Sequence, residues 1–138
     1  MQPNLSPYIT FGGDCKDAME FYKSCLGGKL HLQKYGDTPM PCPDDYKDKI
    51  MHAALENETL SLFACDTQPT KPVTVGDNIH LAVAGSDEQK LKEMFAKLSE
   101  GGTVNMELAP QFWGDTFGML TDKFGIHWMF NISKKKAE

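Results

Sequence analysis

The chain has 138 residues and a net charge of −5, so it is long enough for one well-buried domain and too acidic to favour the phosphate backbone of nucleic acids. No apolar run approaches the roughly 20 residues that a membrane-spanning helix needs, and the N-terminal segment lacks the pattern of a signal peptide. Four cysteines without C-x-x-C spacing predict reduced thiols rather than a structural zinc site. We therefore expect a cytoplasmic protein that binds neither nucleic acid nor membrane.

The first half of the chain predicts a strand, a helix and three further strands. Residues 8–11 form the first strand, and Asp14 is the expected N-cap of a helix that ends at Gly27-Gly28. Further β-like runs cover 29–35, 50–55 and 60–65. The apolar stripe of the helix, at spacings of three and four, consists of Ala18, Phe21, Tyr22, Cys25 and Leu26.

The second half predicts the same order of elements. A strand at 80–83 precedes a helix that begins with a capping-box pattern at Ser86 and Gln89 and stops at Gly101-Gly102. Strands are expected at 103–108, 116–121 and 126–132, and Asp122 to Gly125 has the composition of a type I turn. The helical stripe of this half consists of Leu91, Met94, Phe95 and Leu98.

The two similar halves predict an α+β protein in which two small sheets share a hollow. We expect one domain, 1–138, made of module one (5–66), a proline-containing linker (67–77), module two (78–133) and a lysine-rich tail (134–138). Two copies are too few for a solenoid, and helices on the outer faces leave an inner face that forms a lined groove. The proline-rich loop 35–46 is either a lid over this groove or a disordered excursion.

Strand alternation assigns two faces to residues 126–132. Trp128 belongs to the face under a helix and is expected to be structural, whereas His127 and Met129 belong to the groove face. Trp113, in the segment before this hairpin, either lines the rim of the groove or contacts a second subunit. His52 and His80, on strands, are either hydrogen-bonded structural residues or functional groups in the groove, and Cys65 has the groove parity of its strand.

Four segments carry a family resemblance that covers both halves of the chain. They are PYITFGGDCKDAMEFYKSCLGGKL, KIMHAALENETLSLFACD, NIHLAVAG and FWGDTFGMLTDKFGIHWMFN. In these segments the chain resembles PhnB-like members of the vicinal oxygen chelate superfamily, which includes glyoxalase I, bleomycin-resistance proteins and extradiol dioxygenases. The resemblance implies two βαβββ modules, a U-shaped mixed eight-stranded sheet with helices on the outside, and a homodimer.

The resemblance also implies where a divalent metal would bind, with ligands from the first and last strand of each module. His80 is the one residue that matches this pattern. The other positions fall on Ser6 or Pro7, on Ser61 or Phe63, and on Met129. One ligand does not hold a divalent ion, so the sequence disfavours the metal chemistry of the family, and an unconventional set of His80, His52 and His127 has no support from spacing.

These observations predict a protein that binds a small, partly apolar molecule. Two main functions remain open: an unassigned enzyme of the glyoxalase and dioxygenase type, or a non-catalytic protein that sequesters its ligand as bleomycin-resistance proteins do. A third alternative is a dimer whose groove is filled by its own side chains and which acts only through partners. A methyltransferase is disfavoured, because the glycine pairs do not form a nucleotide-binding loop. The expected cavity residues are His80, Ser61, Phe63, Trp113, His127, Met129 and His52.

Overall fold

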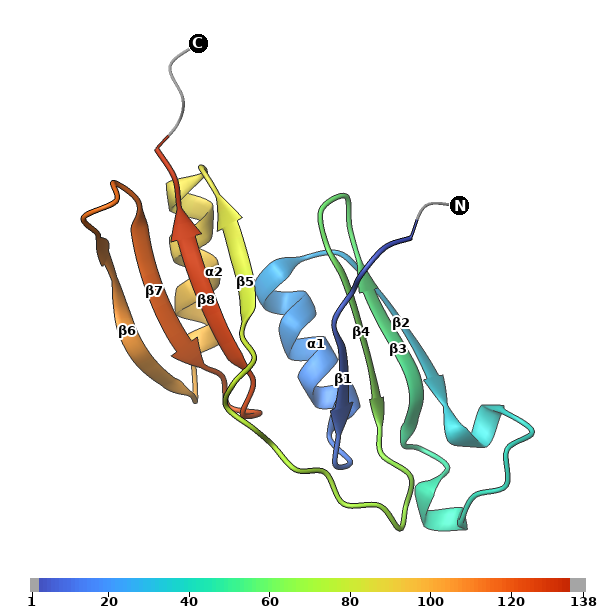
Figure 1. Ribbon diagram of the computed structural model, residues 1–138. Helices are drawn as coiled ribbons and strands as arrows, with labels where there is room; N and C mark the ends of the chain where they lie inside the picture. The colour runs from blue at the N-terminus through green and yellow to red at the C-terminus, as the bar shows by residue number, and fades with distance from the viewer. Residues whose placement is uncertain (1–2, 135–138) are drawn as a thin grey trace. The chain divides into compact units, whose positions relative to one another are not determined.

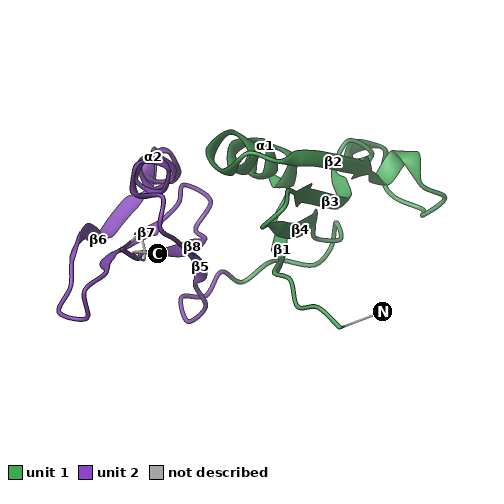
Figure 2. Cartoon of the chain, turned by 90° about the horizontal axis from the view of Figure 1, so that it is seen from above, with its two compact units in different colours: residues 1–74 green, residues 75–138 purple. Residues whose placement is uncertain are grey.

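The computed structural model describes residues 3–134, and the chain divides into two compact units, residues 1–74 and 75–138 (Figure 2). Of the predicted tail, only Lys134 lies within the described residues. No helix in this part of the chain is long and apolar enough to cross a membrane. Unit 1 consists of β1 (Tyr8–Phe11), α1 (Cys15–Leu26), β2 (Lys29–Lys34), two short 3-10 helices (Tyr35–Asp37 and Asp44–Tyr46), β3 (Ile50–Glu56) and β4 (Ser61–Asp66).

Unit 2 repeats this plan (Figure 1). Its sheet has the order β5-β8-β7-β6, as that of unit 1 has the order β1-β4-β3-β2. β1 is parallel to β4, and β5 is parallel to β8. All other neighbouring strands in the two sheets are antiparallel. The predicted α+β fold with two βαβββ modules is confirmed. The elements of unit 2 are β5 (Leu81–Gly85), α2 (Glu88–Ser99), β6 (Thr103–Pro110), β7 (Thr116–Thr121) and β8 (His127–Ile132).

Each helix covers one face of its own sheet. Helix α1 packs on β2, β3 and β4, and α2 packs on β6, β7 and β8. In unit 2 the ring of Phe95 stands edge-on against Phe130, with 5.4 Å between the ring centroids. Burial of these apolar stripes holds the helices, as their spacing predicts. Among residues 3–134, no second helix of the same unit packs on the opposite face of either sheet.

Asp14 occupies the N-cap position of α1 as predicted, although its side chain does not cap the helix, and the N-cap predicted for α2 is wrong by one residue. The Asp14 side chain makes no capping bond, and the amide of Cys15 instead donates to Asp66 Oδ1 at 2.9 Å. In α2 the cap is Asp87 rather than Ser86, because the Asp87 carboxylate accepts from the amide of Lys90. In both helices a carboxylate lies near the positive end of the helix dipole, where negative charge is favourable.

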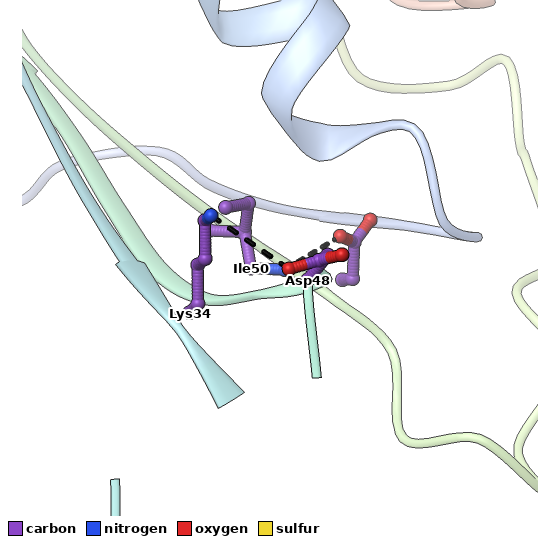
Figure 3. A network of polar contacts seen from close by, with 4 residues as sticks. Lys34, Asp48 and Ile50 are labelled. Atoms are coloured by element: carbon purple, nitrogen blue, oxygen red, sulfur yellow. Dashed lines mark hydrogen bonds and ion pairs between the residues drawn. The ribbon is translucent and has the colours of Figure 1, made fainter. Parts of the chain in front are cut away.

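Asp66 is a buried carboxylate that joins three parts of unit 1. Its Oδ1 accepts from Cys15 at the start of α1, and its Oδ2 accepts from the amide of Ile50 at the start of β3, at 2.9 Å. Its carbonyl oxygen accepts from the hydroxyl of Tyr35. Figure 3 labels Ile50, whose amide donates to Asp66, together with Lys34 and Asp48, whose ion pair lies at the surface.

Asp122 is the buried carboxylate of unit 2. In the turn between β7 and β8 it accepts from the amides of Phe124 and Ile126 and, at 2.8 Å, from the indole Nε1 of Trp128. Trp128 is therefore buried with its polar group bonded, which is the structural role that the sequence predicts for it.

We expect Asp66→Ala to lower the free energy of unfolding by about 2–4 kcal/mol, because it leaves two buried amides without an acceptor. The matched control is Asp48→Ala, which removes a carboxylate that is 94% exposed and should change stability by less than about 0.5 kcal/mol. Urea unfolding followed by circular dichroism measures both. Equal effects of the two substitutions would contradict the structural role of Asp66.

Candidate functional site

The face of the unit 1 sheet opposite α1 carries a cluster of aromatic and polar side chains. Tyr8 on β1 is paired with Phe63 on β4, and their strand neighbours Leu62 and Ala64 are buried on the other face. His52 on β3 lies beside both rings, with centroids 5.9 Å from Tyr8 and 5.9 Å from Phe63. We call Tyr8, His52 and Phe63 the unit 1 aromatic cluster.

A hydrogen bond fixes the polar side of this cluster. The hydroxyl of Tyr8 lies 3.2 Å from Nδ1 of His52. Partial desolvation of the phenol, in a residue that is still 52% exposed, raises the pKa of Tyr8 to about 12, and the neighbouring Cys65 adds to this effect. The Tyr8 hydroxyl therefore keeps its proton at neutral pH and can donate it to a hydrogen-bond acceptor.

The open face of unit 2, opposite α2, is formed by alternate residues of β5, β7 and β8. His127, Met129 and Asn131 lie opposite Thr121, Met119 and Phe117 in the β7–β8 pairing. Trp128 and Phe130, between them, are buried on the helix side. The alternation predicted for this strand is confirmed, whereas its place in a groove stays a prediction.

His127 is held by protein atoms on both sides of its ring. Its Nε2 lies 3.1 Å from the carbonyl oxygen of Gly76, which can only accept, so this nitrogen carries a proton. Its Nδ1 lies 2.9 Å from Thr121 Oγ1, and this hydroxyl is also 2.8 Å from Asn105 Oδ1. Because both nitrogens are bonded within unit 2, His127 is poorly suited to bind a metal.

His80 lies one residue before β5, which begins at Leu81 and not at His80 as predicted. Its ring centroid is 5.4 Å from that of His127, so its imidazole is on the open side of unit 2 and not beneath α2. His52, by contrast, belongs to unit 1. His80 and His127 are thus the predicted histidines that the structure brings together.

Trp113 is held against the open face of unit 2 while half of its surface stays exposed. Its indole Nε1 points to Asn131 Oδ1 at 3.4 Å, and the amide of Asn131 donates to Asp115 Oδ2 at 2.9 Å. Phe117 packs edge-on at 5.8 Å between centroids. Both predicted roles of Trp113, at a cavity rim or at a subunit contact, fit this position.

The remaining sequence candidates have simpler surroundings. Ser61 is exposed at the start of β4, and Cys65, on the same face, has its sulfur 3.9 Å from Thr10 Oγ1. Burial raises the pKa of the Cys15 thiol well above its ordinary value, which makes this cysteine unreactive. The ends of the predicted loop 35–46 are held by ring contact between Tyr35 and Tyr46 and by their hydroxyl bonds to Asp66 and Thr67.

The residues present do not fit the divalent metal of the family resemblance. Within residues 3–134, no three or more His, Cys, Asp or Glu side chains gather closely enough to hold a metal ion. The sequence positions Ser61 and Phe63 offer no carboxylate or imidazole, and Met129 offers a thioether. Hard divalent ions prefer oxygen ligands that this arrangement does not supply.

Sequence analysis missed Tyr8 and Asp115 as site residues. Strand alternation in 8–11 places Tyr8 and Thr10 on one face, so the same argument that assigned His127 and Met129 would have found Tyr8. Asp115 had no comparable signal, because its role depends on Asn131, which is 16 residues away in sequence.

We expect the phenol of Tyr8 to ionise near pH 12. A pKa raised above the unfolded value of about 10 stabilises the folded state at lower pH, and this contribution is lost as the pH rises through about 12. The difference in tyrosinate absorbance between the native protein and Tyr8→Phe measures this titration, and the same difference in denaturant gives the unfolded reference. A native midpoint near the reference would show that Tyr8 is solvated as in a free chain.

Comparison with known proteins gives consistent matches along the chain. The model of the Glyoxalase/Bleomycin resistance protein/Dioxygenase superfamily matches residues 5–130. Protein YjdN of Escherichia coli is 28% identical, over 96% of this chain and 97% of its own length. Among solved structures, protein PA1353 of Pseudomonas aeruginosa is 37% identical with a TM-score of 0.88, covering 97% of this chain and 100% of that one.

A second structure supports the fold alone. It is the PhnB protein of Bacillus cereus, described as a putative 3-demethylubiquinone-9 3-methyltransferase. It is 22% identical with a TM-score of 0.76, and the match covers 95% of this chain and 100% of that one.

Proposed function

Because the chain belongs to the glyoxalase/bleomycin resistance protein/dioxygenase superfamily, we propose that it binds a small, partly apolar molecule on the open faces of its sheets. The observation that carries this proposal is the position of Trp113, which is 48% exposed and yet bonded to Asn131. A large aromatic ring that is left in water but held in one orientation is typical of binding surfaces.

The proposed ligand contacts combine aromatic, thioether and polar groups. In unit 2 they are Trp113, His80, His127 and Met129, and in unit 1 they are the aromatic cluster with Ser61. Such a mixture of apolar area with a few oriented donors and acceptors is what small-molecule sites present. The hydrogen bonds of Trp113, His127 and Tyr8 reduce the side-chain ordering that binding requires.

Two forms of this function differ in chemistry. The pair of Tyr8 and His52 supports an unassigned enzymatic activity, since a protonated phenol beside an imidazole can donate and accept protons. The two engaged nitrogens of His127 support the alternative, a non-catalytic protein that binds or sequesters its ligand. Methyl transfer is not part of the proposal, because Gly27 and Gly101 follow helices, whereas phosphate-binding loops precede them.

We further propose a cytoplasmic homodimer in which the edges of β1 and β5 receive partner strands. Neither strand contains a charged residue or a register shift. The other two edges are protected, since β2 carries lysines and a bulge, and β6 carries two register shifts and Pro110. In this proposal, module 5–66 of one subunit and module 78–133 of its partner join through these edges into one eight-stranded sheet.

A thermal-shift screen of small, partly apolar compounds tests ligand binding. A compound at about 100 times its Kd stabilises the folded protein by about 2.7 kcal/mol and raises its Tm. We expect Trp113→Ala to remove most of this shift. Leu5→Ala is the control, because Leu5 is a large apolar residue of unit 1 that is 98% exposed, whereas the ring of Phe112 packs against Trp113 itself. Equal loss in the two variants, or the absence of any hit, would count against the proposed site.

Light scattering coupled to size-exclusion chromatography tests the dimer. We expect twice the monomer mass for the native protein and the monomer mass for Ala82→Lys/Ala84→Lys, because two charges on exposed residues of the β5 edge oppose strand pairing without entering the core under α2. The control Val104→Lys adds a charge to the protected β6 edge and should stay dimeric. A native monomer, or a dimer that survives the double substitution, would rule out pairing through β5.

A further inference from the structure

A groove lies between α1 and β2, the edge strand of the unit 1 sheet. Its volume is about 620 Å³, and it is lined by Lys16, Glu20, Lys23, Ser24, Leu30 and Leu32. The cross-strand partner of Leu30 is Leu55, which is fully buried on the side of α1, so Leu30 and Leu32 face that side as well. The groove therefore lies on the opposite face of the sheet from the unit 1 aromatic cluster.

The two leucines give the groove an apolar wall. Leu32 is 38% exposed and Leu30 is half-buried, because β2 lies at the edge of the sheet where α1 covers it only in part. They are two residues apart on one strand, so they project from the same face. An apolar chain that lies along β2 would cover both leucines and remove their exposed surface from water.

The helix contributes the charges of the groove. Lys16 and Lys23 lie about two turns apart on α1, and Glu20 lies between them on the same face. None of the ion pairs formed among residues 3–134 involves any of these three side chains. Two lysines and one glutamate leave the lining with a net charge of +1. The groove thus favours a ligand with a single negative charge.

The other polar groups near the groove do not oppose an anion. The hydroxyl of Ser24 donates to the carbonyl oxygen of Phe21 at 2.6 Å, so its proton is used within the helix. The strand β2 contains lysine and histidine but no acidic residue. The ammonium groups of α1 are therefore the donors that the groove offers to an anionic head group.

We propose that this groove binds an amphipathic monoanion, a carboxylate with an unbranched apolar chain. The carboxylate lies at Lys16 and Lys23, and the chain lies along Leu30 and Leu32. The volume is within the range of about 300–1,000 Å³ that is usual for small-molecule sites. The proposal does not depend on the proposed function, which concerns the open faces of the sheets.

An extended acidic peptide is the competing occupant, since β2 is an edge strand. Strand addition needs a regular ladder of backbone hydrogen bonds along that edge. The register of β2 shifts between Gln33 and Lys34, which disturbs such a ladder. A small amphipathic anion needs only the groove itself.

Titration with sodium octanoate, followed by amide signals in nitrogen-15 NMR spectra, tests the proposal. We expect signals of α1 and residues 29–32 to shift and to saturate at one molecule per chain. Octanol and octylamine have the same chain with a neutral and a cationic head. Octanoate should bind more tightly than octanol by roughly fivefold, and octylamine should bind most weakly. Added salt should weaken the binding of octanoate and not that of octanol.

Three substitutions separate the charge from the apolar wall. Lys23→Gln should weaken octanoate binding by roughly threefold and leave octanol binding unchanged. Leu32→Ser should weaken the binding of both probes. Lys97→Gln is the matched control, because Lys97 is the exposed lysine in the last turn of α2 as Lys23 is in α1, and it should change neither.

Four results would overturn the proposal. They are equal binding of octanol and octanoate, equal effects of the two lysine substitutions, shifts on the open faces instead of the groove, and binding of an alternating leucine–glutamate peptide to β2 without any response to octanoate. Shifts on the open faces would leave the proposed function standing, so failure of this site is distinguishable from failure of that function.

Discussion

A buried carboxylate in each unit is the constraint on which the rest of the structure depends. Asp66 accepts hydrogen bonds from the first residue of α1 and the first residue of β3, so it sets where the helix begins over the sheet. Charge-assisted bonds of this kind are stronger than neutral ones, and leaving their donors unpaired in the interior is costly. With α1 anchored on one face, the aromatic cluster of Tyr8, His52 and Phe63 occupies the other.

Asp122 also fixes part of unit 2, but it does so from the turn between β7 and β8 and not from a helix start. It bonds the amides of its own turn and the indole of Trp128, and this holds Trp128 on the side of α2. Because strand residues alternate strictly, the position of Trp128 determines that His127 and Met129 project from the opposite face. The residues that β8 presents on the open face are thus set by the orientation of Trp128 in the core.

Local sequence patterns were sufficient to predict the helices and strands and to assign the two faces of β8. The apolar spacing of both helices, the glycines that end them and the alternation of β8 are properties of short segments, and these predictions agree with the structure. The role of Asp66 at the start of α1 could not be predicted, because Asp66 lies 51 residues from the amide it binds and no local signal marks that pairing. The bond between Tyr8 and His52 spans 44 residues, so no local pattern indicates it.

The two tryptophans give this protein a built-in pair of optical reporters. Trp128 is enclosed and bonded to a carboxylate, so its emission should be shielded from dissolved quenchers until the core opens. Trp113 is half in water at the sheet surface, so its emission responds to whatever settles there. A single fluorescence spectrum therefore contains separate information about occupancy of the surface and about integrity of the interior.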